Sequence, residues 1–177
     1  MRLNPRNDAM KDYYLKQKLF SRNARYEVFD DHEEQLYHGR ARFFSPSRKF
    51  YLFDSKTDTI LYQIKRKIFA FRPTYILYDG NGKEVAKAIR RRAFFKKSIS
   101  VKSDLGDLMI EGNYWAHEFE ILKDETPLAT IRKKRLSFGD SYHVEVSDEA
   151  NSEFFLALAI MIDSKFHQRR RSSRRPH

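Results

Sequence analysis

Short runs of aromatic and β-branched residues, separated by polar turn-forming residues, recur along most of the chain. Three of these runs, at 26–30, 50–54 and 75–79, end in aspartate, and their starts lie 24 and then 25 residues apart. Weaker copies start at Ile99, Phe119 and Tyr142. Runs of this composition that end in turn formers are typical of β-strands joined by hairpins. The pattern therefore predicts six strands.

A second kind of strand lies between these runs. Three eleven-residue segments, 61–71, 85–95 and 128–138, align without gaps; their sixth and seventh positions are basic and their eleventh is phenylalanine. The next large residue follows four positions later, which predicts a tight hairpin, and we expect the recurrent phenylalanine to pack in the core or the hairpin. Related segments occupy 13–20, 36–44 and 108–115. The total is twelve strands whose short connections favour antiparallel pairing.

The pattern changes near the C-terminus, where residues 151–167 contain no glycine or proline and predict a helix. Residues 154–162 are apolar on every side, whereas a surface helix has a polar face. Twelve strands enclose a wide bore, which a helix about 10 Å across can fill. We therefore predict a mainly β fold, a closed antiparallel twelve-stranded barrel enclosing a central hydrophobic C-terminal helix. The alternative is a β-sandwich with the helix on one face. Asp163 is expected to reach a barrel mouth.

Composition is that of one folded, basic domain. The 177 residues include 35 Lys and Arg against 24 Asp and Glu, a net charge of +11, and 41% are hydrophobic. The lack of cysteine excludes disulfides, thiolate metal sites and a cysteine nucleophile. We expect a flexible N-terminus at 1–12, the barrel domain at 13–167 and a disordered basic tail at 168–177. No secretory signal is present and the longest apolar run is too short to span a bilayer, so a cytoplasmic protein is predicted.

Several segments resemble the LURP-one-related family. They are GRARFF at 39–44, IEGNYWAHEFEI at 110–121, LSFGDSYHVEV at 136–146 and the final apolar helix, and the resemblance covers residues 13–166. It implies the tubby C-terminal-like fold shared with phospholipid scramblases, a twelve-stranded barrel around a hydrophobic helix. For function it implies similarity to phosphoinositide-binding modules and to proteins that act at membranes. The phosphoinositide-contacting residues of tubby find no match by position, so none is carried over.

The basic positions of the eleven-residue segments are the candidate binding site, because several arginines and lysines together favour anionic phospholipid headgroups. The candidates are Lys65, Arg66, Lys67, Arg90, Arg91, Arg92, Arg132, Lys133, Lys134 and Arg135. Neighbours on a strand point to opposite faces, so about half of each cluster shares the outer surface and the rest lies near a rim or beside acids. The alternative is a solvated strand face that discourages edge pairing.

Catalytic residues, metal ligands and cofactors are not predicted. His117 beside Glu118, and His143 beside Glu145, would form a weak metal site only if their strands paired, and we interpret them as ordinary strand and hairpin histidines. Ser141 follows a glycine and an aspartate in a hairpin rather than at the strand-to-helix elbow that a nucleophilic serine requires.

The functional hypothesis is a non-enzymatic protein that binds anionic phospholipid, including phosphoinositide, reversibly at a membrane surface. Its alternative is a protein-interaction or non-specific nucleic-acid-associated scaffold that uses the same charge. The arginines of 168–177 suit either partner, or no partner at all.

Overall fold

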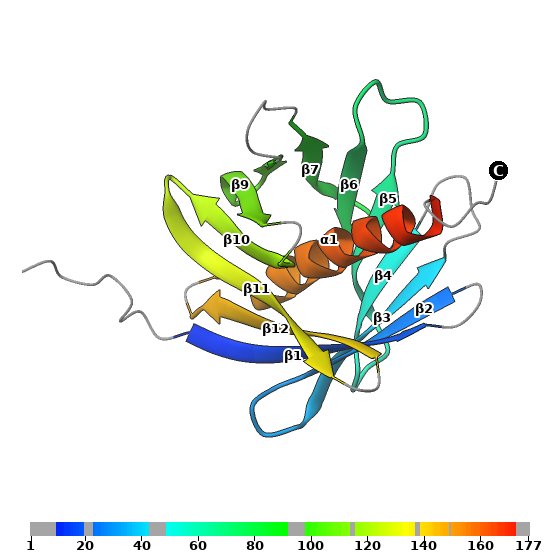
Figure 1. Cartoon of the computed structure of the whole chain (residues 1–177), viewed down its shortest axis with the longest axis vertical. Helices are drawn as coiled ribbons and strands as arrows, with labels where there is room; N and C mark the ends of the chain where they lie inside the picture. The colour runs from blue at the N-terminus through cyan, green and yellow to red at the C-terminus, as the bar shows by residue number, and fades with distance from the viewer. Residues whose placement is uncertain are drawn as a thin grey trace, which may run out of the picture.

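The computed structural model describes residues 10–19, 23–42, 49–91, 98–113, 116–136, 139–148 and 150–172. These residues form twelve strands and one helix (Figure 1). The first six strands are β1 (Met10–Leu19), β2 (Asn23–Phe29), β3 (Gln35–Arg42), β4 (Lys49–Asp54), β5 (Ile60–Arg66) and β6 (Thr74–Asp79). The rest are β7 (Glu84–Arg90), β8 (Ile99–Ser103), β9 (Gly106–Asn113), β10 (Glu118–Lys123), β11 (Thr126–Leu136), β12 (Gly139–Ser147) and the helix α1 (Ser152–Ser172).

The strands form one closed antiparallel barrel in chain order, as predicted. Every strand pairs with its sequence neighbours, and β1 pairs with both β2 and β12, so the sheet has no free edge. All odd-numbered strands therefore run one way and all even-numbered strands the other. We call the end of the barrel where the odd-numbered strands finish the odd rim, and the opposite end the even rim.

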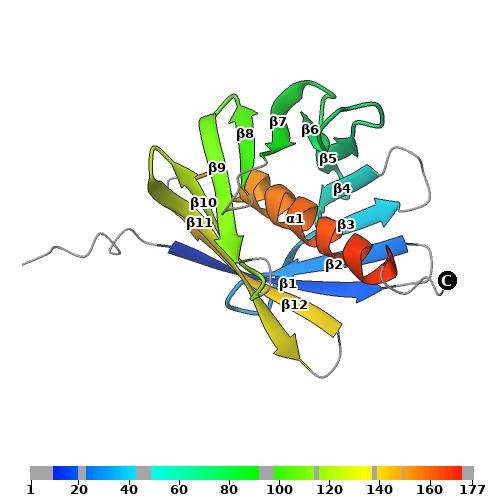
Figure 2. The same ribbon diagram turned by 45° about the horizontal axis from the view of Figure 1, so that its top comes forward.

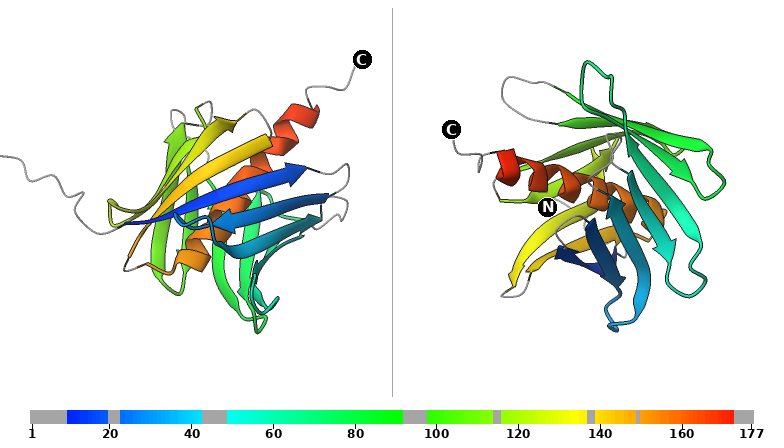
Figure 3. Two further views of the ribbon diagram at one scale, coloured as in Figure 1. Left: turned by 90° about the horizontal axis from the view of Figure 1, so that it is seen from below. Right: turned by 90° about the vertical axis from the view of Figure 1, so that its right-hand side faces the viewer.

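The helix α1 begins after β12 at the even rim and runs through the bore towards the odd rim, with strands on both sides of it (Figures 2 and 3). Side chains 154–162 are all at most 2% exposed, which confirms a central helix and excludes a helix lying on a sandwich face. Asn151 caps it, since its Oδ1 accepts a hydrogen bond from the Phe154 N–H at 2.9 Å. Within the described residues, no helix has the length and apolar content needed to cross a membrane.

Both ends of the domain extend beyond the predicted bounds. The first strand starts at Met10, three residues before the predicted start, and residues 1–9 lie outside the described part of the chain. At the other end α1 continues to Ser172, so residues 168–172, predicted as part of the disordered tail, have helical backbone. Residues 173–177 lie outside the described part.

Small residues on the inner wall make room for the helix. The inward-facing Ala24, Ala41, Ala88 and Ala129 are at most 1% exposed. A Cβ at Gly39 would lie 3.3 Å from the Ile160 Cδ1, tighter than ordinary van der Waals contact. A side chain at position 39 would therefore require Tyr26, whose Cβ would lie 3.1 Å away, or Ile160 to shift by a few tenths of an ångström.

Asp163 does not reach solvent at a barrel mouth, so that expectation was wrong. Its side chain is 1% exposed, and it accepts hydrogen bonds from the hydroxyls of Tyr26, at 2.9 Å, and Tyr142. The Gln17 amide donates in turn to the Tyr26 hydroxyl at 2.9 Å. Burial, and secondarily the nearby Asp163 carboxylate, raise the pKa of Tyr26 well above its usual value. The barrel wall thus supplies the donors that make a buried carboxylate tolerable.

Candidate functional site

The even rim is built from repeated aspartate turns. Asp30 directly follows β2, and Asp54 and Asp79 end β4 and β6; the Oδ1 of each accepts two hydrogen bonds of 2.8–3.0 Å from backbone N–H groups of the following turn. The hydrogen bond from the Thr57 N–H is the largest cause of a lowered pKa at Asp54. The recurrent aspartate of the sequence is therefore a turn residue that satisfies backbone donors.

Acidic residues consequently collect at the even rim. The turns after β8 and β10 add Asp104, Asp124 and Glu125. Two lysines at this rim form ion pairs: Lys56 Nζ lies 2.9 Å from a Glu34 oxygen and Lys83 Nζ lies 2.7 Å from an Asp104 oxygen.

The predicted basic positions that the structure describes lie towards the opposite end. They fall in the C-terminal parts of β5, β7 and β11 or directly after these strands, and because all three are odd-numbered strands, their C-terminal ends lie at the odd rim. Acidic turns and basic strand ends are thus separated along the barrel axis, which creates an uneven electrostatic field.

Seven cations gather in the β4–β7 sector of the odd rim, and we call them the basic rim. They are Lys49, Lys65, Arg66, Lys67, Arg72, Arg90 and Arg91. The hydrogen bond from the Arg90 N–H to the Pro73 carbonyl, 3.1 Å long, holds the end of β7 beside the start of β6. Only β6 separates the ends of β5 and β7, so their backbones lie two strand spacings apart, about 10 Å.

The basic rim has no acidic partner among the residues that the structure describes. None of its seven members forms an ion pair there. Lys49 and Lys65 are direct cross-strand partners, an arrangement that like-charge repulsion disfavours. The ammonium of Lys65 lies 4.5 Å from the centre of the Tyr78 ring. Lys49 was missed in the sequence because it precedes an apolar run, outside the repeated basic positions.

The candidate residues on β11 lie elsewhere and are engaged. Arg132 Nη1 is 2.7 Å from a Glu145 oxygen on β12, and the ammonium groups of Lys133 and Lys134 lie over the rings of Tyr142 and Tyr14. Three strands, β8 to β10, separate β11 from β7. The ten candidates therefore do not form one patch. The side chain of Arg135 and the whole of Arg92 lie outside the described part of the chain.

The predicted division of a cluster between two faces is seen at the ends of β5 and β7. Arg66 follows the buried Ile64 at a spacing of two, and Arg90 likewise follows Ala88, so both belong to the inward-facing rows and lie at the rim. Lys65 belongs to the outward row. The basic rim thus presents charge both on the outer wall and around the mouth.

The connection between β5 and β6 corrects two predictions. It is a seven-residue loop, 67–73, rather than a tight hairpin. The hairpin predicted between β7 and β8 falls on residues 92–97, which lie outside the described part of the chain. Between β11, which ends at Leu136, and β12, which begins at Gly139, residues 137 and 138 lie outside the described part of the chain. Phe71, predicted to pack in the core or in the hairpin, is 101% exposed, with Phe69 at 95% and Ile68 at 51%. The equivalent Phe95 and Phe138 lie outside the described residues.

Proline explains why the β6 ladder starts late. Pro73 accepts the hydrogen bond from the Arg90 N–H but has no N–H with which to return one. The β5–β6 pairing ends at the 2.9 Å hydrogen bond from the Lys67 N–H to the Thr74 carbonyl. The residues between Lys67 and Pro73 therefore have no strand pairing and form the loop, which projects at the top of Figure 1.

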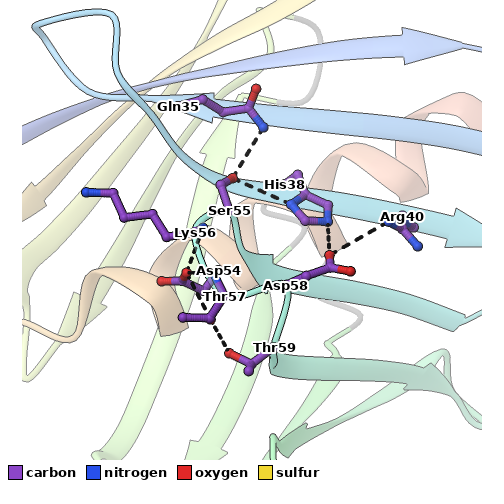
Figure 4. Close-up of polar contacts among 9 residues, drawn as sticks. All are labelled: Gln35, His38, Arg40, Asp54, Ser55, Lys56, Thr57, Asp58 and Thr59. Atoms are coloured by element: carbon purple, nitrogen blue, oxygen red, sulfur yellow. Dashed lines mark hydrogen bonds and ion pairs between the residues drawn. The ribbon is translucent and has the colours of Figure 1, made fainter.

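A Ser, His and Asp cluster that sequence reasoning missed lies at the even rim (Figure 4). Ser55 Oγ is 3.5 Å from His38 Nδ1, and His38 Nε2 is 3.0 Å from an Asp58 oxygen without hydrogen-bond geometry. The Gln35 amide donates to Ser55 Oγ at 3.2 Å, and the His38 ring stacks on Phe53 at 4.9 Å. The Ser–His contact is longer than an ordinary hydrogen bond from a hydroxyl. These contacts join β3 to the turn between β4 and β5. The antiparallel pairing of β3 with β4, which the sequence predicted, was the signal that could have indicated this cluster.

A second polar group ties β1 to β12 and β11. His143 Nε2 lies 2.6 Å from an Asp12 oxygen, and one ligand atom each of Asp12, His143 and Glu145 lie within 4.8 Å of one another. The Thr130 hydroxyl is the main cause of the lowered pKa of Glu145, and Arg132 contributes. Arg132 already neutralises this carboxylate. The approach of His117 to His143 considered from the sequence does not occur by direct strand pairing, because β11 lies between β10 and β12.

Comparison with known proteins identifies the family. A family model described as LURP-one-related matches residues 11–163. The chain belongs to the LURP-one-related family. A relative from Bacillus subtilis (strain 168), named "Uncharacterized protein YxjI", is 31% identical over 154 residues, which cover 87% of this chain and 93% of that protein. The match of this LURP-one-related chain to the family begins in β1 and ends at Asp163, so it includes the barrel and the buried part of α1.

Proposed function

We propose that this LURP-one-related protein is a non-enzymatic module that binds anionic phospholipid headgroups, including phosphoinositides, reversibly at the cytoplasmic face of a membrane. One observation carries the proposal: a basic rim without acidic partners among the described residues, on a barrel whose aspartate turns lie at the other end. The central helix in a closed barrel also supports the proposed relationship to tubby C-terminal-like proteins and phospholipid scramblases.

The strength of such binding follows from the charges. Each lysine or arginine near an anionic leaflet contributes about 1 kcal/mol, so several cations give reversible attachment that salt weakens. Arginine adds bidentate hydrogen bonds to phosphate. A phosphate between Lys49 and Lys65 would also relieve their mutual repulsion.

The same charges orient the protein. With the odd rim towards the membrane, the aspartate turns at the even rim face away from the negative surface. The reverse orientation would bring those carboxylates to the headgroups. The β11 residues have a smaller role in this proposal, because Arg132 is paired with Glu145.

Flotation with vesicles tests the proposal. Vesicles of phosphatidylcholine alone are compared with vesicles that also contain phosphatidylserine or a phosphoinositide, at low and physiological salt. Wild type is expected to float only with the anionic vesicles and more weakly at the higher salt.

Two triple variants with the same change in net charge locate the site. Lys65→Gln/Arg66→Gln/Lys67→Gln is expected to lose about 100-fold in affinity at low salt, from about 1 kcal/mol per cation. Arg132→Gln/Lys133→Gln/Lys134→Gln removes the same charge from β11 and is expected to lose less than about tenfold.

Three outcomes would contradict the proposal. If the wild-type protein fails to float with anionic vesicles at low salt, the proposal of lipid binding is wrong. Equal losses in the two triple variants would show an effect of net charge and no role for the basic rim. Retention of random-sequence RNA under conditions where no vesicle binds would favour the nucleic-acid-associated scaffold instead.

A further inference from the structure

The loop at 67–73 holds apolar side chains outward on a fixed base. The Lys67 N–H bonds to the Thr74 carbonyl at 2.9 Å, and the Thr74 hydroxyl donates to the Arg72 carbonyl at 2.9 Å. The neighbouring strand adds the bond from Arg90 to Pro73. The base of the loop is thus anchored to β6 and β7, while Phe69 and Phe71 remain almost wholly in solvent.

Exposure of this kind is costly and usually marks a contact surface. Ile68, Phe69 and Phe71 are three of the six large hydrophobic residues found exposed in the described part of the chain, and they lie within four positions of each other. The segment from Leu61 to Tyr78 contains four cations and no acid. An apolar tip on a base of unpaired positive charge therefore distinguishes this loop.

We propose that Ile68, Phe69 and Phe71 insert into the boundary between headgroups and acyl chains of an anionic bilayer, while the basic rim binds the headgroups. The inference rests on the proposed function and adds to it the depth and mode of attachment. Apolar side chains at the tip of the loop and the basic rim at its base match the two layers of a bilayer. These layers are the headgroup phosphates and, about 5–10 Å deeper, the hydrocarbon.

Charge selects this partner over others. A second copy of the chain would bring two basic rims together, which repel. A bilayer with anionic lipid offers a broad negative surface to all seven cations and a place for the phenylalanine rings in one contact. Insertion should also slow dissociation from the membrane, because burial of apolar surface adds binding free energy. Salt does not screen this contribution, in contrast to that of the charges.

Paired serine variants test insertion by flotation on anionic vesicles. Phe69→Ser/Phe71→Ser is expected to lose at least about tenfold in affinity, and the binding that remains should be more sensitive to salt. Ile60→Ser/Leu105→Ser is the matched control, since these residues are each 42% exposed and lie at the even rim. The control should bind like wild type.

The absence of cysteine from the natural sequence allows a direct measurement of depth. Ile68→Cys labelled with an environment-sensitive fluorophore keeps both phenylalanines, and its emission is expected to shift to the blue on anionic vesicles. Asn81→Cys carries the same label on the turn after β6, at the even rim, and should not change.

The outcomes separate the two proposals. If wild type binds anionic vesicles but the phenylalanine variant binds equally well and the label at position 68 does not shift, insertion is wrong and headgroup binding stands. If wild type binds no anionic vesicle, both proposals fail. If the phenylalanine variant instead abolishes a concentration-dependent dimer in analytical ultracentrifugation, a second copy is the partner and bilayer insertion is overturned.

Discussion

Strands β5 and β11 start from the same eleven-residue pattern and end in different structures. In the first copy the strand stops at Arg66, and the remaining residues enter an exposed loop. In the second copy pairing continues to Leu136, and the basic residues remain within the sheet. Figure 1 shows the two regions on opposite sides of the barrel, with the β5–β6 loop at the top and the end of β11 at the lower right.

Neighbouring strands account for the difference. Strand β6 begins directly after Pro73, whereas β11 contains no proline after position 127 and β12 contains none. Across the ladder, Lys65 faces Lys49 and Ile76, while Arg132 faces Glu118 and His143 and pairs diagonally with Glu145. Identical basic positions therefore become an unpaired cation group in one place and a neutralised strand face in the other.

Aspartate substitutions should separate the two regions most strongly. Ile131 on β11 is 1% exposed, and Ile131→Asp places an unpaired charge inside the barrel, with an expected loss of several kcal/mol in the free energy of unfolding. Phe71→Asp changes a fully exposed side chain and is expected to alter stability by less than about 0.5 kcal/mol. Denaturant unfolding followed by circular dichroism measures both.

A large destabilisation by Phe71→Asp would mean that the loop packs against the barrel. Ile131→Val serves as the control for the β11 site, because it removes one methyl group without a charge and should cost about 0.5–1.5 kcal/mol.

Neutralising single cations should have effects of opposite sign. Arg132→Gln removes an ion pair at a half-exposed site and is expected to lower the free energy of unfolding by up to about 1 kcal/mol, less at high salt. Lys65→Gln removes a repulsion with Lys49 and should leave stability unchanged or raise it by a few tenths of a kcal/mol. Denaturant unfolding at two salt concentrations measures both changes in the free energy of unfolding. If Lys65→Gln lowered this free energy as much as Arg132→Gln does, the predicted difference between the two sites would be wrong.

The smallest effect concerns the titration of Glu145. Its pKa lies below the ordinary 4.5, first because of the Thr130 hydroxyl and then because of charge from Arg132. Thr130→Val is therefore expected to move the pKa towards 4.5, as an NMR titration would show. A lowered pKa stabilises the folded state above pH 4.5, and this stabilisation disappears as the pH falls through the folded-state value. Thr130→Ser keeps the hydroxyl and should leave the pKa low.

Much of the architecture followed from the sequence. The runs that end at Asp30, Asp54 and Asp79 marked strands and their turns, and the all-round apolar stretch at 154–162 required enclosure. The candidate site was predicted in part: the basic positions were found, but the exposure of Phe71, the membership of Lys49 and the separation of β11 from β5 were not. Asp163 and the Ser55–His38 contact were likewise unforeseen, because each depends on residues distant in the chain.

Strand alternation, turn aspartates and a helix without a polar face are local properties, and they determined that this chain would close a twelve-stranded barrel around its last helix. The partner of each charge is a different matter, because it depends on which strands lie side by side and on where their hydrogen bonding stops. Only the folded barrel set Arg132 beside Glu145, left Lys65 beside Lys49, and held Phe69 and Phe71 out in solvent on the loop between β5 and β6.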